Sequence, residues 1–190
     1  MNEPFIKGCC YHIYNRGCNR EHIFFKEENY IYLLKKMQSS RLKYGANILA
    51  YCLMPNHYHF LTRQETDRPL SDWIQTLFNG YSQAINKQQK RSGTLFQGRA
   101  KHIWVDNDGY LIHLARYIHY NPVAAHLVSL PENWQYSNYA EWIGTRNGTL
   151  IDREFVRSYF TQPEDYRRFV MDYVVESQLG EKLKKYILLE

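Results

Sequence analysis

The sequence predicts an α+β fold built around a mainly antiparallel β-sheet. Short apolar and aromatic runs bounded by Gly, Asn and Pro are typical of strands, whereas longer runs repeat their apolar residues at helical spacing. Along the chain these runs follow the order strand, helix, strand, strand, helix, strand, which is the split β-α-β pattern of a ferredoxin-like sheet. We therefore expect the helices to cover one face of the sheet.

The first half of the chain supplies three of the strands. Residues 8–15 form a strand rich in aromatic side chains that ends at an Asn-Arg-Gly turn. Residues 26–44 repeat apolar side chains at helical spacing, and Gly45 follows as a stop. A strand over 47–53 and its partner, which runs through Thr62, then form a hairpin.

The second half of the sheet motif begins with another helix. Residues 69–90 place large apolar side chains every four positions, which is typical of a helix packed on a core. A strand over 102–105 follows, and the Asp-Asn-Asp cluster at 106–108 is a strong helix start. The helix that it opens runs over 109–121, and Pro122 is expected to end it.

Most of the chain of 190 residues is expected to form one domain. We place this domain at 8–145 and a C-terminal helical extension at 146–190. Within the extension, 152–160 and 163–173 have the pattern of helices, and the run 180–190 is amphipathic and charged. That last run docks on the domain or frays.

Basic residues are segregated along the sequence. The net charge is +5, and no acidic residue occurs between Asp72 and Asp106. That span carries five of the basic residues, Lys87, Lys90, Arg91, Arg99 and Lys101. Such a segment is the footprint expected for a polyanionic partner. The alternative, which we weigh equally from the charges alone, is a solvated helix end at which cations suit the helix dipole.

The spacing of the cysteines and the length of the apolar runs predict the cellular compartment. The four cysteines form no Cys-x-x-Cys pair and no zinc-ribbon spacing, which favours reduced thiols. The N-terminus lacks the pattern of a signal peptide, and no apolar stretch approaches the roughly 18 residues of a membrane span. We therefore expect a soluble, cytoplasmic protein with no membrane partner.

The hairpin carries a pair of histidines. His57 and His59 are two residues apart on an expected strand, so both imidazoles point to one face while Tyr58 points to the other. Two neutral imidazoles side by side on a strand make half of a metal site. The alternative is a pair of partly buried histidines that hydrogen-bond locally, and for an isolated His-x-His pattern this alternative is favoured.

The helix over 109–121 adds a second candidate group. His113, Tyr117 and Asn121 are spaced four apart and share one helical face. A tyrosine hydroxyl beside a metal can attack a phosphodiester, and an amide oxygen is an available third ligand. Spacing alone favours the alternative, in which Tyr117 simply packs on the sheet.

Five short blocks, in this order, resemble the HUH family of single-tyrosine transposases, and most closely the branch of REP-associated tyrosine transposases. The blocks are Tyr11-His12-Ile13-Tyr14-Asn15-Arg16-Gly17, Met54-Pro55-Asn56-His57-Tyr58-His59, Leu95-Phe96-Gln97-Gly98-Arg99, Arg116-Tyr117-Ile118-His119-Tyr120-Asn121-Pro122-Val123 and Trp134-Gln135-Tyr136-Ser137-Asn138-Tyr139. They span residues 11–142. The His-x-His pattern alone is weakly specific, whereas the ordered set is strongly specific.

The resemblance implies a ferredoxin-like fold and a Mg²⁺ or Mn²⁺ site made by His57 and His59. It implies that Tyr117 attacks single-stranded DNA beside a hairpin, giving a 5′-phosphotyrosine and a free 3′-hydroxyl. Asn121 stands where the family has its third ligand, one helical turn after the tyrosine. The chain departs from the family in Tyr58, where an aliphatic residue is usual. A bacterial-type, nucleoid-associated location is also implied.

The resemblance also assigns the basic residues to DNA phosphates. This set comprises Arg16, Arg20, Lys87, Lys90, Arg91, Arg99 and Lys101. Two other functions stay open: a domesticated protein that binds hairpin DNA without cutting it, and an unrelated metallohydrolase that activates water at His57 and His59. A homodimer and a monomer are both compatible with the sequence.

Overall fold

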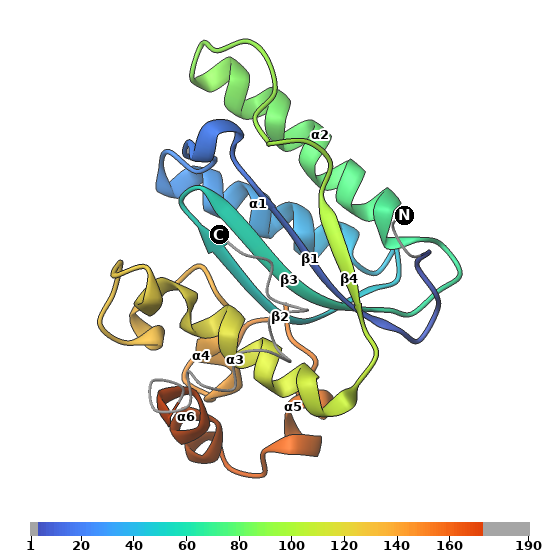
Figure 1. Cartoon of the computed structure of the whole chain (residues 1–190), viewed down its shortest axis with the longest axis vertical. Coiled ribbons are helices and arrows are strands. Elements are labelled where there is room, and N and C mark those ends of the chain that lie inside the picture. The colour runs from blue at the N-terminus through green and yellow to red at the C-terminus, as the bar shows by residue number, and fades with distance from the viewer. Residues whose placement is uncertain (1–3, 173–190) are drawn as a thin grey trace.

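The computed structural model describes residues 4–172. Its centre is a four-stranded sheet in the order β2-β3-β1-β4, and every neighbouring pair is antiparallel. The strands are β1 (Cys10–Arg16), β2 (Ala46–Met54), β3 (His57–Gln64) and β4 (Lys101–Val105). Together with the helices between them, they form the α+β, ferredoxin-like arrangement that the sequence predicted (Figure 1).

Helices α1 (Glu27–Ser40) and α2 (Leu70–Gln88) cover one face of the sheet, which we call the α1–α2 face. The core on this face joins helix residues such as Leu33 and Trp73 to strand residues such as Phe60, and all three are fully buried. Alternation along the strands explains which residues take part, because every second side chain points to the same face. The expectation of helices on one face therefore describes α1 and α2.

The opposite face is covered as well. Helix α3 (Asp108–Ala124) packs on β2 and β3, and the short helices α4 (Tyr139–Trp142), α5 (Arg153–Tyr159) and α6 (Pro163–Met171) complete the layer. This face has to be covered because the buried side chains of β2 are divided between the cores on both faces of the sheet. An apolar strand has to be covered on both faces. We call this second face the histidine face.

Helix α3 does not end before Pro122, as the sequence suggested, but includes it and continues to Ala124. Pro122 lies in the last turn, where it removes only one intrahelical hydrogen bond. The carbonyl groups of Asn121 and Pro122 are satisfied: the N–H of Ala125 donates to that of Asn121 at 2.9 Å, and the N–H of Leu127 donates to that of Pro122 at 2.9 Å. Asn121 is therefore held in regular helical geometry.

Other boundaries differ by a few residues. Helix α1 ends at Ser40 rather than near Tyr44, and a turn leads to Gly45, whose positive φ of 61° suits glycine. Two 3₁₀ turns were not expected, η1 (Cys18–Arg20) and η2 (Pro131–Asn133). The amphipathic run at 180–190 lies outside the described residues.

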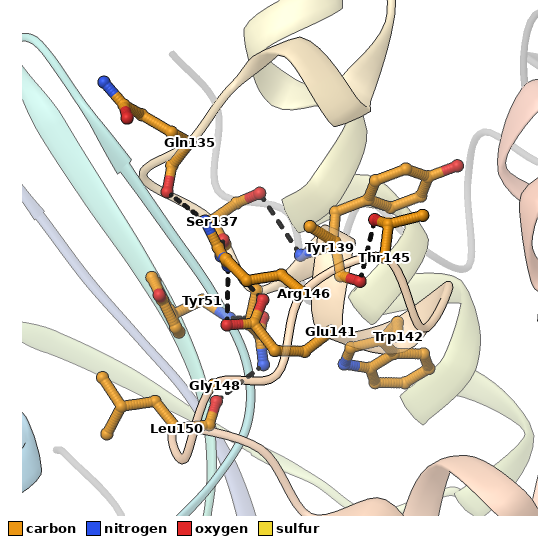
Figure 2. Close-up of polar contacts among 12 residues, drawn as sticks. Tyr51, Gln135, Ser137, Tyr139, Glu141, Trp142, Thr145, Arg146, Gly148 and Leu150 are labelled. Atoms are coloured by element: carbon orange, nitrogen blue, oxygen red, sulfur yellow. Dashed lines mark hydrogen bonds and ion pairs between the residues drawn. The ribbon is translucent and has the colours of Figure 1, made fainter.

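The segment around α4 is fastened to β2 by polar contacts (Figure 2). The side chain of Asn138 accepts from the N–H of Tyr51 at 2.8 Å and donates to the carbonyls of Leu49 and Leu150 at 3.0 and 3.1 Å. Beside it, the buried carboxylate of Glu141 pairs with Arg146 at 2.6 Å. These contacts fix the chain between α3 and α5 against the sheet.

The C-terminal helices share their core with α3. Phe155 of α5 and Tyr166 of α6 belong to the same buried cluster as Leu114 and Ile118 of α3. The division at residue 145 therefore stays a prediction, and the core of the histidine face runs across it.

Candidate functional site

Strand β3 presents His57 and His59 on the histidine face. Antiparallel pairing with β1 sets His59 opposite Tyr14 and His57 opposite Arg16. Tyr58 points to the other face, where it is fully buried and its ring stacks on Phe78 at a centroid distance of 4.3 Å. The two imidazoles lie 5.0 Å apart, centroid to centroid, with their planes nearly perpendicular at 81°.

Helix α3 brings Tyr117 and Asn121 to this pair of histidines. The ring of Tyr117 lies edge-on to His59, with 5.5 Å between centroids. Asn121 Oδ1 lies 3.3 Å from His57 Nε2. Residues that are about sixty positions apart in the sequence thus meet where α3 crosses β3. His57 and Tyr117 are half-buried, whereas His59 and Asn121 are buried.

The hydrogen bonds around His57 direct a lone pair into the site. The Nδ2 of Asn56 donates to the Arg20 carbonyl at 3.2 Å, so its Oδ1 faces His57 Nδ1, at 2.7 Å. A neutral His57 then carries its proton on Nδ1 and a lone pair on Nε2. Asn121 also presents an acceptor there, because its Nδ2 donates to the Tyr117 carbonyl at 3.4 Å. Two acceptors that converge in this way suit a cation between them.

His59 supplies a third converging atom. Its Nδ1 lies 2.9 Å from His12 Nε2, and its buried Nε2 has no hydrogen-bond partner within residues 4–172. Burial, followed by the neighbouring His12 and His57, holds the pKa of His59 well below its usual range. A neutral imidazole nitrogen that carries a lone pair can bind a metal ion. The donor set of two imidazoles and one amide oxygen therefore fits a divalent cation.

Two other histidines of the region lie elsewhere. Within the described part of the chain, no three side chains of His, Cys, Asp or Glu come together as a metal cluster. His113, one turn before Tyr117, receives a hydrogen bond from Arg116 at 3.0 Å and packs on Phe169. His119 is fully buried, and its Nδ1 lies 2.6 Å from the hydroxyl of Tyr166 in α6. The candidate site is thus confined to His57, His59, Tyr117 and Asn121.

The candidate DNA-contacting residues gather at one end of the molecule, where β1 ends, β3 and β4 begin and α2 stops. We call this the basic end; its members are Arg16, Arg20, Lys87, Lys90, Arg91, Arg99 and Lys101. Five of them are exposed, whereas Arg16 donates to Gln97 and Arg91 pairs with Glu21 at 3.6 Å. His57 lies at the same end of the sheet, so the charge and the candidate site are neighbours.

His12 was not singled out from the sequence, although it contacts His59. Alternation along β1 places His12 on the same face as Cys10, which belongs to the core of the histidine face. The face on which His12 lies could thus be predicted from the sequence. The pairing of β1 with β3, which brings the two imidazoles together, could not be predicted from one sequence.

Neither the cysteines nor an apolar helix contributes to the candidate site in the described residues. Cys9, Cys10, Cys18 and Cys52 are all free thiols. Among the helices of residues 4–172, none combines the length and the apolar character that crossing a bilayer requires.

Comparison with known proteins places these observations in context. Residues 5–121 match the sequence model of a family described as "Transposase IS200 like". No curated protein gave a significant sequence match. Among solved structures, the chain is similar to a REP-associated tyrosine transposase bound to a REP hairpin, with 19% identity, 80% of this chain and 93% of that chain covered, and a TM-score of 0.65.

A weaker similarity links the chain to tRNA(His) guanylyltransferase from Saccharomyces cerevisiae, with 11% identity, 95% of this chain and 82% of that chain covered, and a TM-score of 0.47. The match to the REP-associated protein shows a shared fold, and the second match is too distant to carry an argument.

Proposed function

The chain belongs to the family of IS200-like transposases, and from this premise we propose that it cleaves and rejoins single-stranded DNA beside a hairpin through a covalent bond to Tyr117. The observation that supports this proposal is the convergence of Tyr117 with His57, His59 and Asn121 on the histidine face. Separate stretches of the chain meet there with the side chains that a metal-assisted attack on phosphorus requires.

In the proposed reaction, the hydroxyl oxygen of Tyr117 attacks the phosphorus of the scissile phosphodiester. A bond forms between that oxygen and phosphorus, and the bond from phosphorus to the 3′ oxygen breaks. The 3′ oxygen leaves with a proton as a free hydroxyl, and the tyrosine proton is released. The 5′ end stays attached to Tyr117, and attack of another 3′-hydroxyl on the same phosphorus reverses the chemistry and joins a new strand.

His57, His59 and Asn121 would hold a Mg²⁺ or Mn²⁺ ion, which polarises a phosphoryl oxygen when bound. The chain's own contribution is orientation. Asn56 fixes the ring of His57, and the burial of His59 keeps that imidazole neutral. Helix α3 carries the nucleophile and the amide ligand one turn apart, so both are placed by a single rigid element.

The proposed DNA partner is a hairpin with a single-stranded flank. The structural neighbour is bound to a REP hairpin, and the exposed lysines and arginines of the basic end supply the positive charge that phosphates attract. Because the basic end adjoins His57, a hairpin held there would have its flank close to Tyr117.

The decisive experiment is a covalent-adduct assay. With Mg²⁺ or Mn²⁺ and a hairpin oligonucleotide that has single-stranded flanks, the protein should form a DNA adduct that survives denaturant. Tyr117→Phe should abolish the adduct because the attacking oxygen is removed. Tyr120→Phe is the matched control on the same helix and should retain it. An adduct with Tyr117→Phe would show that another residue is the nucleophile.

The histidines are tested in the same assay. His57→Ala or His59→Ala should abolish cleavage and leave most of the hairpin binding, because the phosphate contacts lie in the basic end. Equal loss of binding and cleavage would assign the histidines a structural role. Hairpin binding by the wild-type protein without any adduct would support the non-cleaving alternative.

A further inference from the structure

His12 lies beneath the candidate metal site, on β1. It is fully buried, and its ring stacks on His59 at 5.1 Å with 22° between the planes. Tyr14 completes the stack, 4.9 Å from His12 and 6.1 Å from His59, centroid to centroid. Antiparallel pairing of β1 with β3 holds all three rings on the histidine face. His59 is therefore fixed by packing as well as by its hydrogen bond.

The hydrogen bond between His12 Nε2 and His59 Nδ1 is 2.9 Å long and admits two directions. If His12 donates, a neutral His59 carries its own proton on Nε2, which is buried and has no acceptor among the described residues. An unsatisfied buried donor is unfavourable by about 1–3 kcal/mol, as is an unsatisfied buried acceptor, and a cation can relieve the cost only where Nε2 carries a lone pair. If His59 donates from Nδ1, its Nε2 carries a lone pair instead, and the atom can bind a cation.

We propose that His12 is a positioning residue whose Nε2 accepts a hydrogen bond from the Nδ1–H of His59 and so holds the His59 Nε2 lone pair towards the metal site. The inference rests on the metal site of the proposed function and extends it to a residue outside the ligand set. Groups that fix the tautomer of a ligating histidine typically change metal affinity by 10–100-fold. Their usual chemistry is a carboxylate, a carbonyl or a water, whereas here it is a second imidazole.

The first test is metal binding without DNA. Mn²⁺ is titrated into the full-length protein by calorimetry, and the dissociation constant is compared among three proteins. His12→Phe keeps an aromatic ring in the stack but removes the acceptor, and it should weaken Mn²⁺ binding about 10–100-fold. His12→Gln places an amide oxygen near the position of Nε2 and should restore most of the affinity. Because His12→Phe keeps a ring in the stack and His12→Gln does not, rescue by Gln assigns the effect to hydrogen bonding rather than to packing.

The second test reads the tautomer directly. Nitrogen-15 chemical shifts of the metal-free protein should show a proton on Nδ1 of His59 in the wild type. In His12→Phe the proton should move, in whole or in part, to Nε2. A wild-type His59 with its proton on Nε2 would overturn the proposal, as would equal Mn²⁺ affinity of wild type and His12→Phe.

These measurements separate the inference from the proposed function. If Mn²⁺ binding depends on His12 but no DNA adduct forms, the positioning role stands and the transposase chemistry falls. If the adduct forms at Tyr117 but the Mn²⁺ affinity does not depend on His12, the transposase chemistry stands and the positioning role falls. Wild-type protein that binds no Mn²⁺ would overturn the inference.

Discussion

Two buried histidines of the histidine face differ in how their nitrogens are used. His119 donates from Nε2 to Asn138 Oδ1 at 2.8 Å and accepts at Nδ1 from the Tyr166 hydroxyl at 2.6 Å. Both of its nitrogens are satisfied by the protein. His59 is equally buried, yet its Nε2 has no partner within residues 4–172. This difference separates a histidine that stabilises the fold from one that is available to a ligand.

His119 makes the stability of the protein depend on pH. Burial lowers the pKa of His119 from 6.5 to about 4; the Asn138 hydrogen bond opposes this shift and Arg146 adds to it. The unfolded chain thus binds more protons between these values, so stability is full above about pH 6.5 and falls as the pH approaches 4. The shift corresponds to about 3 kcal/mol.

The measurement is urea unfolding of wild type and His119→Gln from pH 7 to pH 4. Gln can still donate to Asn138 and accept from Tyr166, but it does not titrate. The wild type should lose about 3 kcal/mol more than the variant over this range. Parallel curves for the two proteins would show that His119 does not titrate in this way.

At the scale of single residues, the sequence predicts what depends on local geometry. Alternation along a strand placed His57 and His59 on one face without any knowledge of the fold. The contact of Asn121 with His57, and of His12 with His59, depends on how helix and strands pack. Such long-range contacts leave no periodic signal in one sequence.

At the scale of elements, Asn138 joins three parts of the chain. It bonds to Tyr51 and Leu49 of β2, to Leu150 before α5, and to His119 of α3. All four hydrogen-bonding positions of its amide are used. This one side chain therefore sets the distance between α3, which carries Tyr117, and the sheet that carries the histidines.

Asn138→Ala should lower the free energy of unfolding by about 3–5 kcal/mol, because it leaves several buried backbone groups and His119 without partners. The matched control is Asn86→Ala, which removes one exposed hydrogen bond to the Gly93 carbonyl and should cost less than about 1 kcal/mol. Urea unfolding measures both. A similar small loss for both variants would contradict the role given to Asn138.

Element boundaries were predictable where the signal is local and not where packing decides. The N-cap of α3 lies in the expected Asp-Asn-Asp cluster, with Asn107 accepting from Gly109 at 2.8 Å. Helix α3 extends past the predicted end at residue 121 to Ala124, because Pro122 does not end it. In the structure Pro122 is buried in the last turn, where packing outweighs its single missing hydrogen bond.

At the scale of the whole molecule, two lysines lie at the end of the sheet opposite the basic end. Lys7 precedes β1 and Lys43 precedes β2, so both lie at the far end of the sheet from His57. Both are exposed, as are Lys87, Lys90 and Arg99 of the basic end. Removing exposed cations from one end or from the other therefore tests whether DNA binding depends on where the charge lies.

Replacing Lys87, Lys90 and Arg99 by Gln should weaken hairpin binding and reduce its salt dependence. Each lost phosphate contact lowers the slope of log affinity against log salt by about 0.7–0.9. Fluorescence anisotropy of a labelled hairpin, in a Tyr117→Phe background that cannot cleave, measures the slope. Lys7→Gln with Lys43→Gln should leave it unchanged. Equal effects at both ends would mean that DNA follows net charge rather than this surface.

The overall fold was largely predictable, because the order of strands and helices limits the topology to few choices. The covering of the second face was not predictable in detail. Its core draws on Trp142, Phe155 and Tyr166, which lie in the short helices α4, α5 and α6. Weak local patterns specify helices only once they meet a surface to pack on.

The order of the elements along the chain also has a consequence for folding during synthesis. A ribosome releases β1, β2, β3 and the two helices of the α1–α2 face first, so one half of the core can consolidate early. The core of the histidine face, to which Leu61 of β3 belongs, is completed only after α3 and α6 have been synthesised. The candidate site is thus completed late in synthesis, because Tyr117 and Asn121 lie on α3, which follows all four strands. A truncated chain that stops before α6 would carry all four candidate site residues but would lack Tyr166, which packs with α3 in the core of the histidine face.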